Sequence, residues 1–289
     1  MDSFLADGGG NLANLAGADV ELHRGNMGDM DPAPLLEGVE VIFNLAGGSS
    51  HVGGQEDPLA DIENNIRAQV RLIEAVRDRA PDAVVVHAST RQLYGRPQSL
   101  PVNEEHPVVP PDANSVSKFA GEQYWMLEHR LRECRVVSLR LTNCYGPRMR
   151  IRDSRQNFLG HWIGQVLRGQ PFELWGGAQL RDLTFVDDAT DAFLAAAVTP
   201  GCYGGVFNIG GAGPVSLREI ADKVIEIAGG GARCTMGEFP NDRSRIDIGS
   251  YFADDSAFKA ATEWSPSTGF AEGFAQTLDW FRLNRSAYL

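Results

Sequence analysis

The sequence predicts an α/β fold: a doubly wound parallel sheet with helices on both faces, closed at the carboxyl ends of its strands by a smaller C-terminal cap. Three observations support this. Short apolar runs alternate with amphipathic helical stretches from residue 19 to about 142. The run Val84-Val85-Val86 is continuously apolar, which is typical of a strand covered on both faces. Beyond Pro147, glycine pairs punctuate shorter segments, as expected of a cap.

The elements follow from these patterns in chain order. Apolar residues at three- and four-residue steps between positions 62 and 76 predict the first long helix, and a second runs from about Ser115 to Cys134. Further helices are expected around Phe158–Arg168 and at Leu217–Ile227. The alternation with strands implies right-handed crossovers. The strand candidates are Val20–Leu22, Val39–Leu45, Ala83–His87 and Val136–Leu141.

Composition excludes several classes of protein. The formal charge of −12 makes a sequence-independent nucleic-acid binder improbable. No apolar run approaches the roughly 20 residues that span a bilayer, and the N-terminus lacks the pattern of a secretion signal. The six histidines include no HExxH-type pair, so no metal site is expected. The four cysteines lack CxxC spacing and predict reduced thiols in a cytoplasmic protein.

Six motifs occur in a fixed order along the chain. They are Asn44-Leu-Ala-Gly47, Ser89-Thr-Arg-Gln-Leu-Tyr-Gly95, Asn114-Ser-Val-Ser-Lys118, Arg140-Leu-Thr-Asn-Cys-Tyr-Gly-Pro147, Leu180-Arg-Asp-Leu-Thr-Phe-Val-Asp-Asp188 and Phe207-Asn-Ile-Gly-Gly211. In this order and spacing they resemble the extended short-chain dehydrogenase/reductase family, in its nucleotide-sugar epimerase/dehydratase branch, which includes UDP-glucose 4-epimerases. The resemblance implies a Rossmann-like sheet and an enzyme that uses NAD to oxidise a hydroxyl of an NDP-hexose.

The resemblance also implies a division of the chain. Residues 1–147, together with roughly 181–210, would form the NAD-binding domain. Residues 148–180 and 211–289 would form the substrate-binding cap. Family members commonly dimerise through the two long helices of the sheet domain, so a homodimer is expected.

The N-terminal region departs from the family pattern. The family begins with a strand and a GxxGxxG turn that approaches the cofactor pyrophosphate, whereas here Gly8-Gly9-Gly10 follows no apolar strand. Asp2 resembles the acidic residue that holds the adenosine ribose. By this comparison the first strand–helix unit, roughly 30 residues, is missing. Either the start codon is assigned too late, or the chain packs differently or borrows a strand; an open sheet edge and weak NAD binding are then expected.

The second departure lies in the catalytic helix. The family carries YxxxK, whose Tyr takes the hydroxyl proton and whose Lys lies one turn further on. Lys118 is present, but Asn114 occupies the tyrosine position. An amide has no proton to exchange near neutral pH and cannot be the general base. Tyr94 is the nearby phenol that could replace it.

The remaining site residues are implied by the resemblance. Thr90 would bond the reacting sugar oxygen, and Lys118 would contact the nicotinamide ribose. Asn114 would donate a hydrogen bond to a substrate or backbone carbonyl, or would only begin a helix. The other expected cofactor contacts are Asp2, Ala46 and Gly47.

The substrate would be held from the cap side. Asn143 and Arg181 would meet the diphosphate, because guanidinium suits phosphate bidentately. Arg243 and Arg245 each lie one residue away from the family's second phosphate arginine, and the sequence does not choose between them. Tyr251 would limit the space around the sugar 2-substituent and favour hexose over N-acetylhexosamine.

Two functional hypotheses follow. The first is an NDP-hexose epimerase or dehydratase whose proton-transfer group is unassigned. The second is a catalytically silent sensor or scaffold that binds an NDP-sugar or a dinucleotide. Asn114 and the missing glycine turn motivate the second hypothesis.

Overall fold

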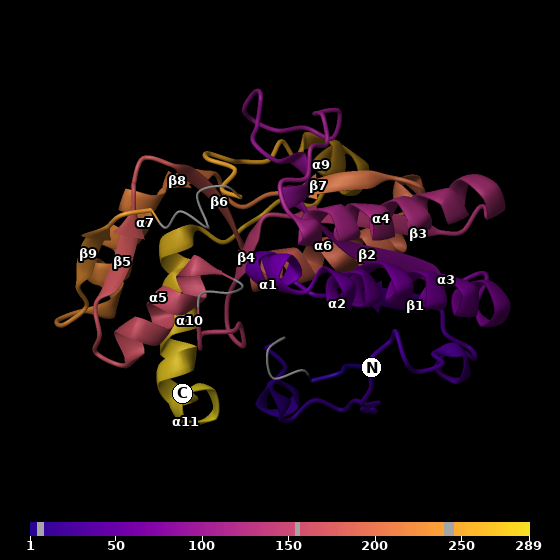
Figure 1. Cartoon of the computed structure of the whole chain (residues 1–289), viewed down its shortest axis with the longest axis horizontal. Coiled ribbons are helices and arrows are strands. Elements are labelled where there is room, and N and C mark those ends of the chain that lie inside the picture. The colour runs from indigo at the N-terminus through magenta and orange to yellow at the C-terminus, as the bar shows by residue number, and fades with distance from the viewer. Residues whose placement is uncertain (5–8, 154–156, 240–245) are drawn as a thin grey trace.

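Four parallel strands form the central sheet, in the order β1-β2-β3-β7. The computed structural model describes residues 1–4, 9–153, 157–239 and 246–289. Figure 1 shows the sheet as the middle layer of the right-hand part of the molecule. The strands are β1 (Val41–Asn44), β2 (Val84–Thr90), β3 (Val136–Leu141) and β7 (Val206–Ile209).

Helices cover both faces of this sheet, which confirms the predicted fold class. Val85 points into a core shared with Leu72 and Trp125 on one face. Val84 and Val86 point to the opposite face, so the run is apolar throughout because both faces are buried. The helices of the first face are α3 (Ala68–Arg79) and α4 (Ala113–Arg132), and those of the second are α6 (Val186–Val198) and α9 (Ser256–Thr262).

Shorter helical segments connect these elements. They are η2 (Leu12–Leu15), η3 (Ala33–Leu35), α1 (His51–Glu56), α2 (Pro58–Ile62), the π-helix η4 (Glu63–Arg67), η5 (Arg91–Tyr94) and η6 (Pro200–Cys202). Within the described parts of the chain, no helix is both long enough and apolar enough to cross a bilayer.

The cap has its own strands and its own core. One sheet has three strands in the order β4-β6-β8, and a second sheet is formed by β5 and β9. Trp162, Phe172, Phe185 and Phe274 are among its buried core side chains. The cap occupies the left of Figure 1, and β4 lies at its junction with the central sheet. Its elements are β4 (Asn143–Tyr145), α5 (Phe158–Leu167), β5 (Phe172–Trp175), β6 (Leu180–Phe185), β8 (Pro214–Ser216), α7 (Leu217–Ala228), β9 (Cys234–Gly237), α10 (Phe270–Leu283) and α11 (Arg285–Tyr288).

One of the four strand predictions is wrong. Residues 20–22 form no strand, and Val20 and Leu22 are 57% and 38% exposed. The backbone nearby forms an isolated bridge between Asp2 and Arg24. A three-residue segment such as Val20-Glu21-Leu22 forms a strand only where a neighbouring strand can pair with it, and the described structure supplies this one bridge.

Strand β1 forms one edge of the central sheet within the described residues. It pairs with β2 on one side, and Val41 and Phe43 remain 37% and 42% exposed. The N-terminal segment runs below this part of the sheet (Figure 1). The expected open edge is therefore found at β1.

The predicted division into two domains stays a prediction, and α9, β6 and β4 pack across it. Helix α9 comes from the segment 211–289 assigned to the cap, yet Phe258 packs against Phe207 of the central sheet, with ring centroids 5.4 Å apart. Strand β6, assigned to the NAD-binding part, pairs with β4 and places Phe185 in the cap core. Chain order alone does not determine which core an element joins.

Candidate active site

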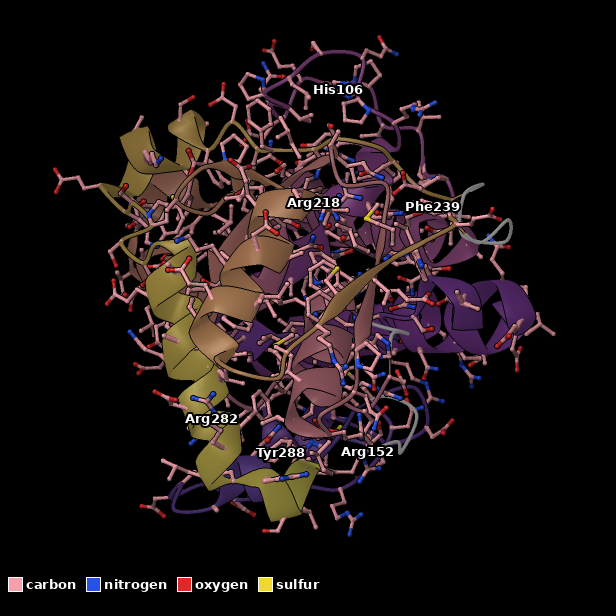
Figure 2. The ribbon with its side chains drawn as sticks, turned by 90° about the vertical axis from the view of Figure 1, so that its left-hand side faces the viewer. His106, Arg152, Arg218, Phe239, Arg282 and Tyr288 are labelled. Atoms are coloured by element: carbon pink, nitrogen blue, oxygen red, sulfur yellow. The ribbon has the colours of Figure 1, made fainter. Side chains whose placement is uncertain are left out.

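A cavity of about 430 Å³ lies where the sheet meets the cap. Its volume falls in the range of small-molecule sites. Figure 2 shows one lining residue, Phe239, on the segment that follows β9. The polar lining includes His51, Arg91, Gln92, Asn143, Arg181 and Asp247, and the aromatic lining is Phe158, Trp162, Trp175 and Phe239. Cationic groups beside aromatic faces suit a ligand that combines an anionic group with a flat ring.

Arg181 lines this cavity, as predicted for a substrate anchor, but protein groups already hold its guanidinium. Nη1 donates to the carbonyl oxygens of Leu180 and Gly249, and Nη2 lies 3.3 Å from Oδ1 of Asp247. Burial lowers the pKa of Arg181, and Asp247 opposes that shift. The side chain is therefore rigidly placed at the cavity wall.

Asn143 and Arg91 form the neighbouring part of the wall. Nη2 of Arg91 donates to Oδ1 of Asn143 at 3.0 Å, while Nη1 of Arg91 is buried without a hydrogen-bond partner among the described residues. The guanidinium stacks 5.0 Å above the ring of Tyr251. Sequence reasoning missed Arg91 as a site residue, although its place directly after Thr90 was a usable signal.

Tyr251 lies behind Arg91 and does not line the cavity. It is 1% exposed and stacks on Tyr94 with ring centroids 6.4 Å apart. Burial raises the pKa of its hydroxyl above the ordinary range. The structure thus brings Tyr251 to the site through its contact with Arg91, whereas the expectation was a direct limit on the space around the sugar.

Thr90 and Lys118 lie at the carboxyl ends of the strands. Thr90 ends β2, and its hydroxyl accepts a hydrogen bond from the backbone of Gln92 at 3.2 Å. Lys118 lies beside Gly47, which follows β1: a Cβ on Gly47 would come within 3.2 Å of Nζ of Lys118 and 2.6 Å of Oδ1 of Asn65. Burial lowers the pKa of Lys118, and Asp61 opposes that shift. Gly47 is needed here because a side chain would collide with this group.

Asn114 serves as a buried cross-link. Its Nδ2 donates to the carbonyl oxygen of Gly48 at 3.0 Å and to Oδ1 of Asp61 at 2.7 Å. Asn65 donates to the same carboxylate at 3.0 Å. Of the two predicted alternatives, the geometry matches the bond to a backbone carbonyl. Oδ1 of Asn114 is buried without a partner among the described residues.

Tyr94 does not fit the predicted role as a replacement for the catalytic tyrosine. Its side chain is fully buried, and its hydroxyl donates to Oδ1 of Asn208 at 2.8 Å and accepts from Nη1 of Arg140 at 2.7 Å. Burial raises the pKa of Tyr94, although Arg140 opposes the shift. A phenol enclosed in this way cannot reach a ligand in the cavity.

A histidine that sequence reasoning overlooked lies on the cavity wall next to helix α4. Nδ1 of His51 lies 3.1 Å from Oδ2 of Asp112, whose side chain is fully buried. Gln92 donates to the same oxygen at 3.2 Å. Burial raises the pKa of Asp112, but His51 and the bonds from Ser115 outweigh it and leave that pKa below its ordinary value. The usable signal was an acidic helix cap two residues before Asn114.

Three predicted residues are not joined to this group. The carboxylate of Asp2 accepts from the backbone of Phe4 at 2.7 Å, and no described contact links Asp2 to Gly47 or Lys118. Arg243 and Arg245 lie outside the described residues.

The group around Lys118 fits the nicotinamide ribose of NAD. The backbone of Ala46 and Gly47 is exposed, so it can be approached by a ligand. Among the described residues, no hydrogen bond or ion pair engages the ammonium of Lys118, and Oδ1 of Asn114 is an unused buried acceptor. Free donors and acceptors beside an uncovered glycine backbone are what a ribose requires.

Fold and site together define a doubly wound α/β protein with a ligand cleft between its sheet and its cap. The model of the NAD dependent epimerase/dehydratase family matches residues 7–210. The chain is 31% identical to a UDP-glucose 4-epimerase of Mycolicibacterium smegmatis, over 98% of this chain and 94% of that protein. It is 29% identical to a dTDP-glucose 4,6-dehydratase of Streptomyces niveus, over 96% and 82%. The protein belongs to the NAD-dependent epimerase/dehydratase family.

The solved structures agree with this assignment. A UDP-glucuronic acid 4-epimerase from Bacillus cereus, solved with UDP-glucuronic acid and NAD, superposes with a TM-score of 0.84. That protein is 26% identical, and the match covers 98% of this chain and 90% of that one. The family resemblance predicted from the six motifs is confirmed.

Proposed function

We propose that this protein binds a nucleoside-diphosphate hexose in the junction cavity and oxidises one hydroxyl of its sugar as the first step of an epimerisation or dehydration. The observation that carries the proposal is the cavity itself, where Arg91, Arg181 and four aromatic side chains line one space beside the carboxyl end of β2. Ligands of open α/β sheets bind at this edge. The Bacillus cereus relative was solved with UDP-glucuronic acid and NAD, which supports a nucleotide sugar as the ligand.

The residues take distinct roles in this proposal. Thr90 donates a hydrogen bond to the reacting sugar oxygen, and Lys118 holds the nicotinamide ribose between the backbone of Gly47 and helix α4. Asn143 and Arg181 bind the diphosphate. Lys118 and the backbone of Gly47 would hold NAD, which would supply the hydride acceptor for this oxidation.

The proton of that hydroxyl goes to His51 in our proposal. The side-chain amide of Asn114 neither takes up nor releases a proton as an acid or base near neutral pH, and the hydroxyl of Tyr94 is enclosed. His51 lines the cavity, and its Nδ1 faces the buried carboxylate of Asp112 at 3.1 Å. A carboxylate that faces one ring nitrogen orients the imidazole, which leaves Nε2 to accept the proton.

Ligand-induced stabilisation tests the binding step. UDP-glucose and dTDP-glucose are each added to the purified protein and the melting temperature is followed. A ligand at about 100 times its dissociation constant stabilises the folded state by about 2.7 kcal/mol, so a clear upward shift is expected. Asn143→Ala should weaken that shift, and a surface substitution, Arg79→Gln, is the matched control. No shift with any UDP- or dTDP-sugar would contradict the proposal.

The second candidate, a silent binding protein, is favoured by Asn114, which cannot act as the general base. Both candidates predict ligand binding, so turnover separates them. Conversion of UDP-glucose or dTDP-glucose by the unmodified chain, measured by chromatography of the nucleotide sugars, would exclude the silent candidate. Bound NAD is measured by mass spectrometry of the same sample.

The homodimer remains part of this proposal. Helix α4 exposes an apolar stripe made of Val116, Tyr124 and Leu131, which are 52%, 44% and 64% exposed. A second copy of the chain would cover this stripe. The four cysteines carry free thiols, which supports our placement of the protein in the cytoplasm.

A further inference from the structure

Arg91 carries a charge that no carboxylate in the described structure pairs with. Nη2 donates to the neutral Oδ1 of Asn143, and Nη1 is buried without a hydrogen-bond partner. The two other buried arginines of this region are both paired: Arg140 lies 2.6 Å from Glu122, and Arg181 lies 3.3 Å from Asp247. Arg91 is thus the exception among them.

The nearest acidic groups are already engaged. The carboxylate of Asp182 accepts from the backbone of Gly211 at 2.7 Å and of Ala253 at 3.0 Å. Asp247 accepts from Gly249 at 3.0 Å as well as facing Arg181. Neither lies within ion-pair distance of Arg91.

Arg91 remains protonated at neutral pH in spite of its surroundings. Burial, followed by the charge of Arg181, lowers its pKa to about 10, which is still well above 7. A buried charge without a partner is unfavourable. An anion that enters the cavity beside the Arg91 guanidinium reduces this penalty, so the site favours an anionic ligand group.

The position of Arg91 indicates which part of the substrate supplies the anion. It directly follows Thr90, to which the proposed function assigns the reacting sugar oxygen, and it lines the same cavity as Arg181. The diphosphate is assigned to Arg181 and Asn143. Because Arg91 bonds Asn143 and directly follows Thr90, its guanidinium lies between a residue assigned to the diphosphate and the residue assigned to the sugar, where a carboxylate on the sugar can meet its charge.

We propose that Arg91 binds the carboxylate of the sugar, so that the preferred substrate is a nucleoside-diphosphate uronic acid. This inference rests on the proposed function and narrows it from hexoses to their C6 acids. The stack of Arg91 on Tyr251 and its bond to Asn143 hold the guanidinium in place before the ligand arrives. The preference for the uronic acid then comes from the positive charge of Arg91, which a sugar carboxylate pairs and which UDP-glucose leaves unpaired.

Calorimetric titration of UDP, UDP-glucose and UDP-glucuronic acid into the wild-type protein and Arg91→Gln tests the inference. Glutamine retains an amide donor for Asn143 and removes the charge. The wild type should prefer UDP-glucuronic acid over UDP-glucose by about 10- to 100-fold, the equivalent of one hydrogen bond to a charged group. Arg91→Gln should lose that preference and bind UDP and UDP-glucose within about threefold of the wild type.

Arg91→Lys retains the charge and should keep part of the preference, while Arg79→Gln should change nothing. An equal loss for all three ligands would place Arg91 on the diphosphate and overturn the inference. Unchanged binding in Arg91→Gln would also overturn it. If Arg91→Gln does not fold, equal wild-type affinities for UDP-glucose and UDP-glucuronic acid overturn it without any variant. A wild type that binds none of the three ligands refutes the proposed function itself.

Discussion

At the scale of single residues, the hydroxyl of Tyr94 links three parts of the chain. Tyr94 follows β2, Arg140 lies on β3 and Asn208 lies on β7, and the hydroxyl bonds both partners. Arg140 in turn is paired with the buried Glu122 of α4. The network fixes neighbouring strands to one another, so this tyrosine contributes to stability.

We expect Tyr94→Phe to lower the free energy of unfolding by about 1–3 kcal/mol, because Nη1 of Arg140 and Oδ1 of Asn208 each lose a partner. Urea denaturation measures this loss. Binding of UDP-glucose should stay unchanged in the same variant. A variant that keeps its stability but loses turnover would restore Tyr94 as the proton-transfer group.

His51 is the residue on which turnover should depend. His51→Gln is expected to lower the turnover number by about 10²–10⁴-fold, the usual contribution of a general base, while UDP-sugar binding persists. Imidazole added to His51→Gly should restore part of the rate, since 30% exposure leaves the side chain accessible. The control is His23→Gln. His23 is paired with Glu21 and lies far from helix α4 along the sequence. Full activity of His51→Gln would eliminate this assignment.

At the scale of elements, the start of helix α4 positions the site. Asp112 is its N-cap: Oδ1 accepts from the backbone of Ser115 at 2.8 Å, and Ser115 bonds back in a capping box. The same carboxylate faces His51 and accepts from Gln92. One buried side chain therefore fixes the helix that carries Asn114 and also holds the groups of the cavity wall.

We expect Asp112→Ala to lower the free energy of unfolding by about 1–2 kcal/mol near neutral pH through loss of the cap. The pKa of Asp112 is lowered in the folded protein, so its charge stabilises the fold above the ordinary value of 3.8 and this contribution disappears as the pH falls through the lowered value. Asp112→Asn keeps a capping oxygen. Its stability deficit relative to the wild type should shrink on acidification, as urea denaturation at several pH values will show. A deficit that grows would contradict this account.

At the scale of the whole molecule, the exposed stripe on α4 predicts self-association. The double substitution of Tyr124 and Leu131 by lysine should convert a dimer into a monomer, because two charges cannot be buried unpaired in an apolar interface. Light scattering after size-exclusion chromatography measures the mass. Leu194→Lys, at a 51% exposed leucine on the opposite face, is the matched control. A wild-type protein that is monomeric at high concentration would refute the dimer.

The whole fold was predictable to the extent that its signals are local. Helix α4 was expected from about Ser115 to Cys134 and spans Ala113–Arg132, since its apolar stripe and its cap lie in one stretch of sequence. The absence of a strand at residues 20–22 was not predictable, because strand pairing depends on a neighbour. The same applies to α9, which joins the central sheet although chain order assigned it to the cap.

The sequence by itself determined the fold class and the family, because these follow from local patterns and from motifs in fixed order. Only the tertiary structure decided which polar groups already have hydrogen-bond partners within the protein. Tyr94 is enclosed by Arg140, Asn114 is bonded to Asp61, and Arg91 is left with a free donor. In these cases the two hydrogen-bonded residues are 46 or more positions apart in the sequence. A local sequence pattern therefore cannot predict the pairing.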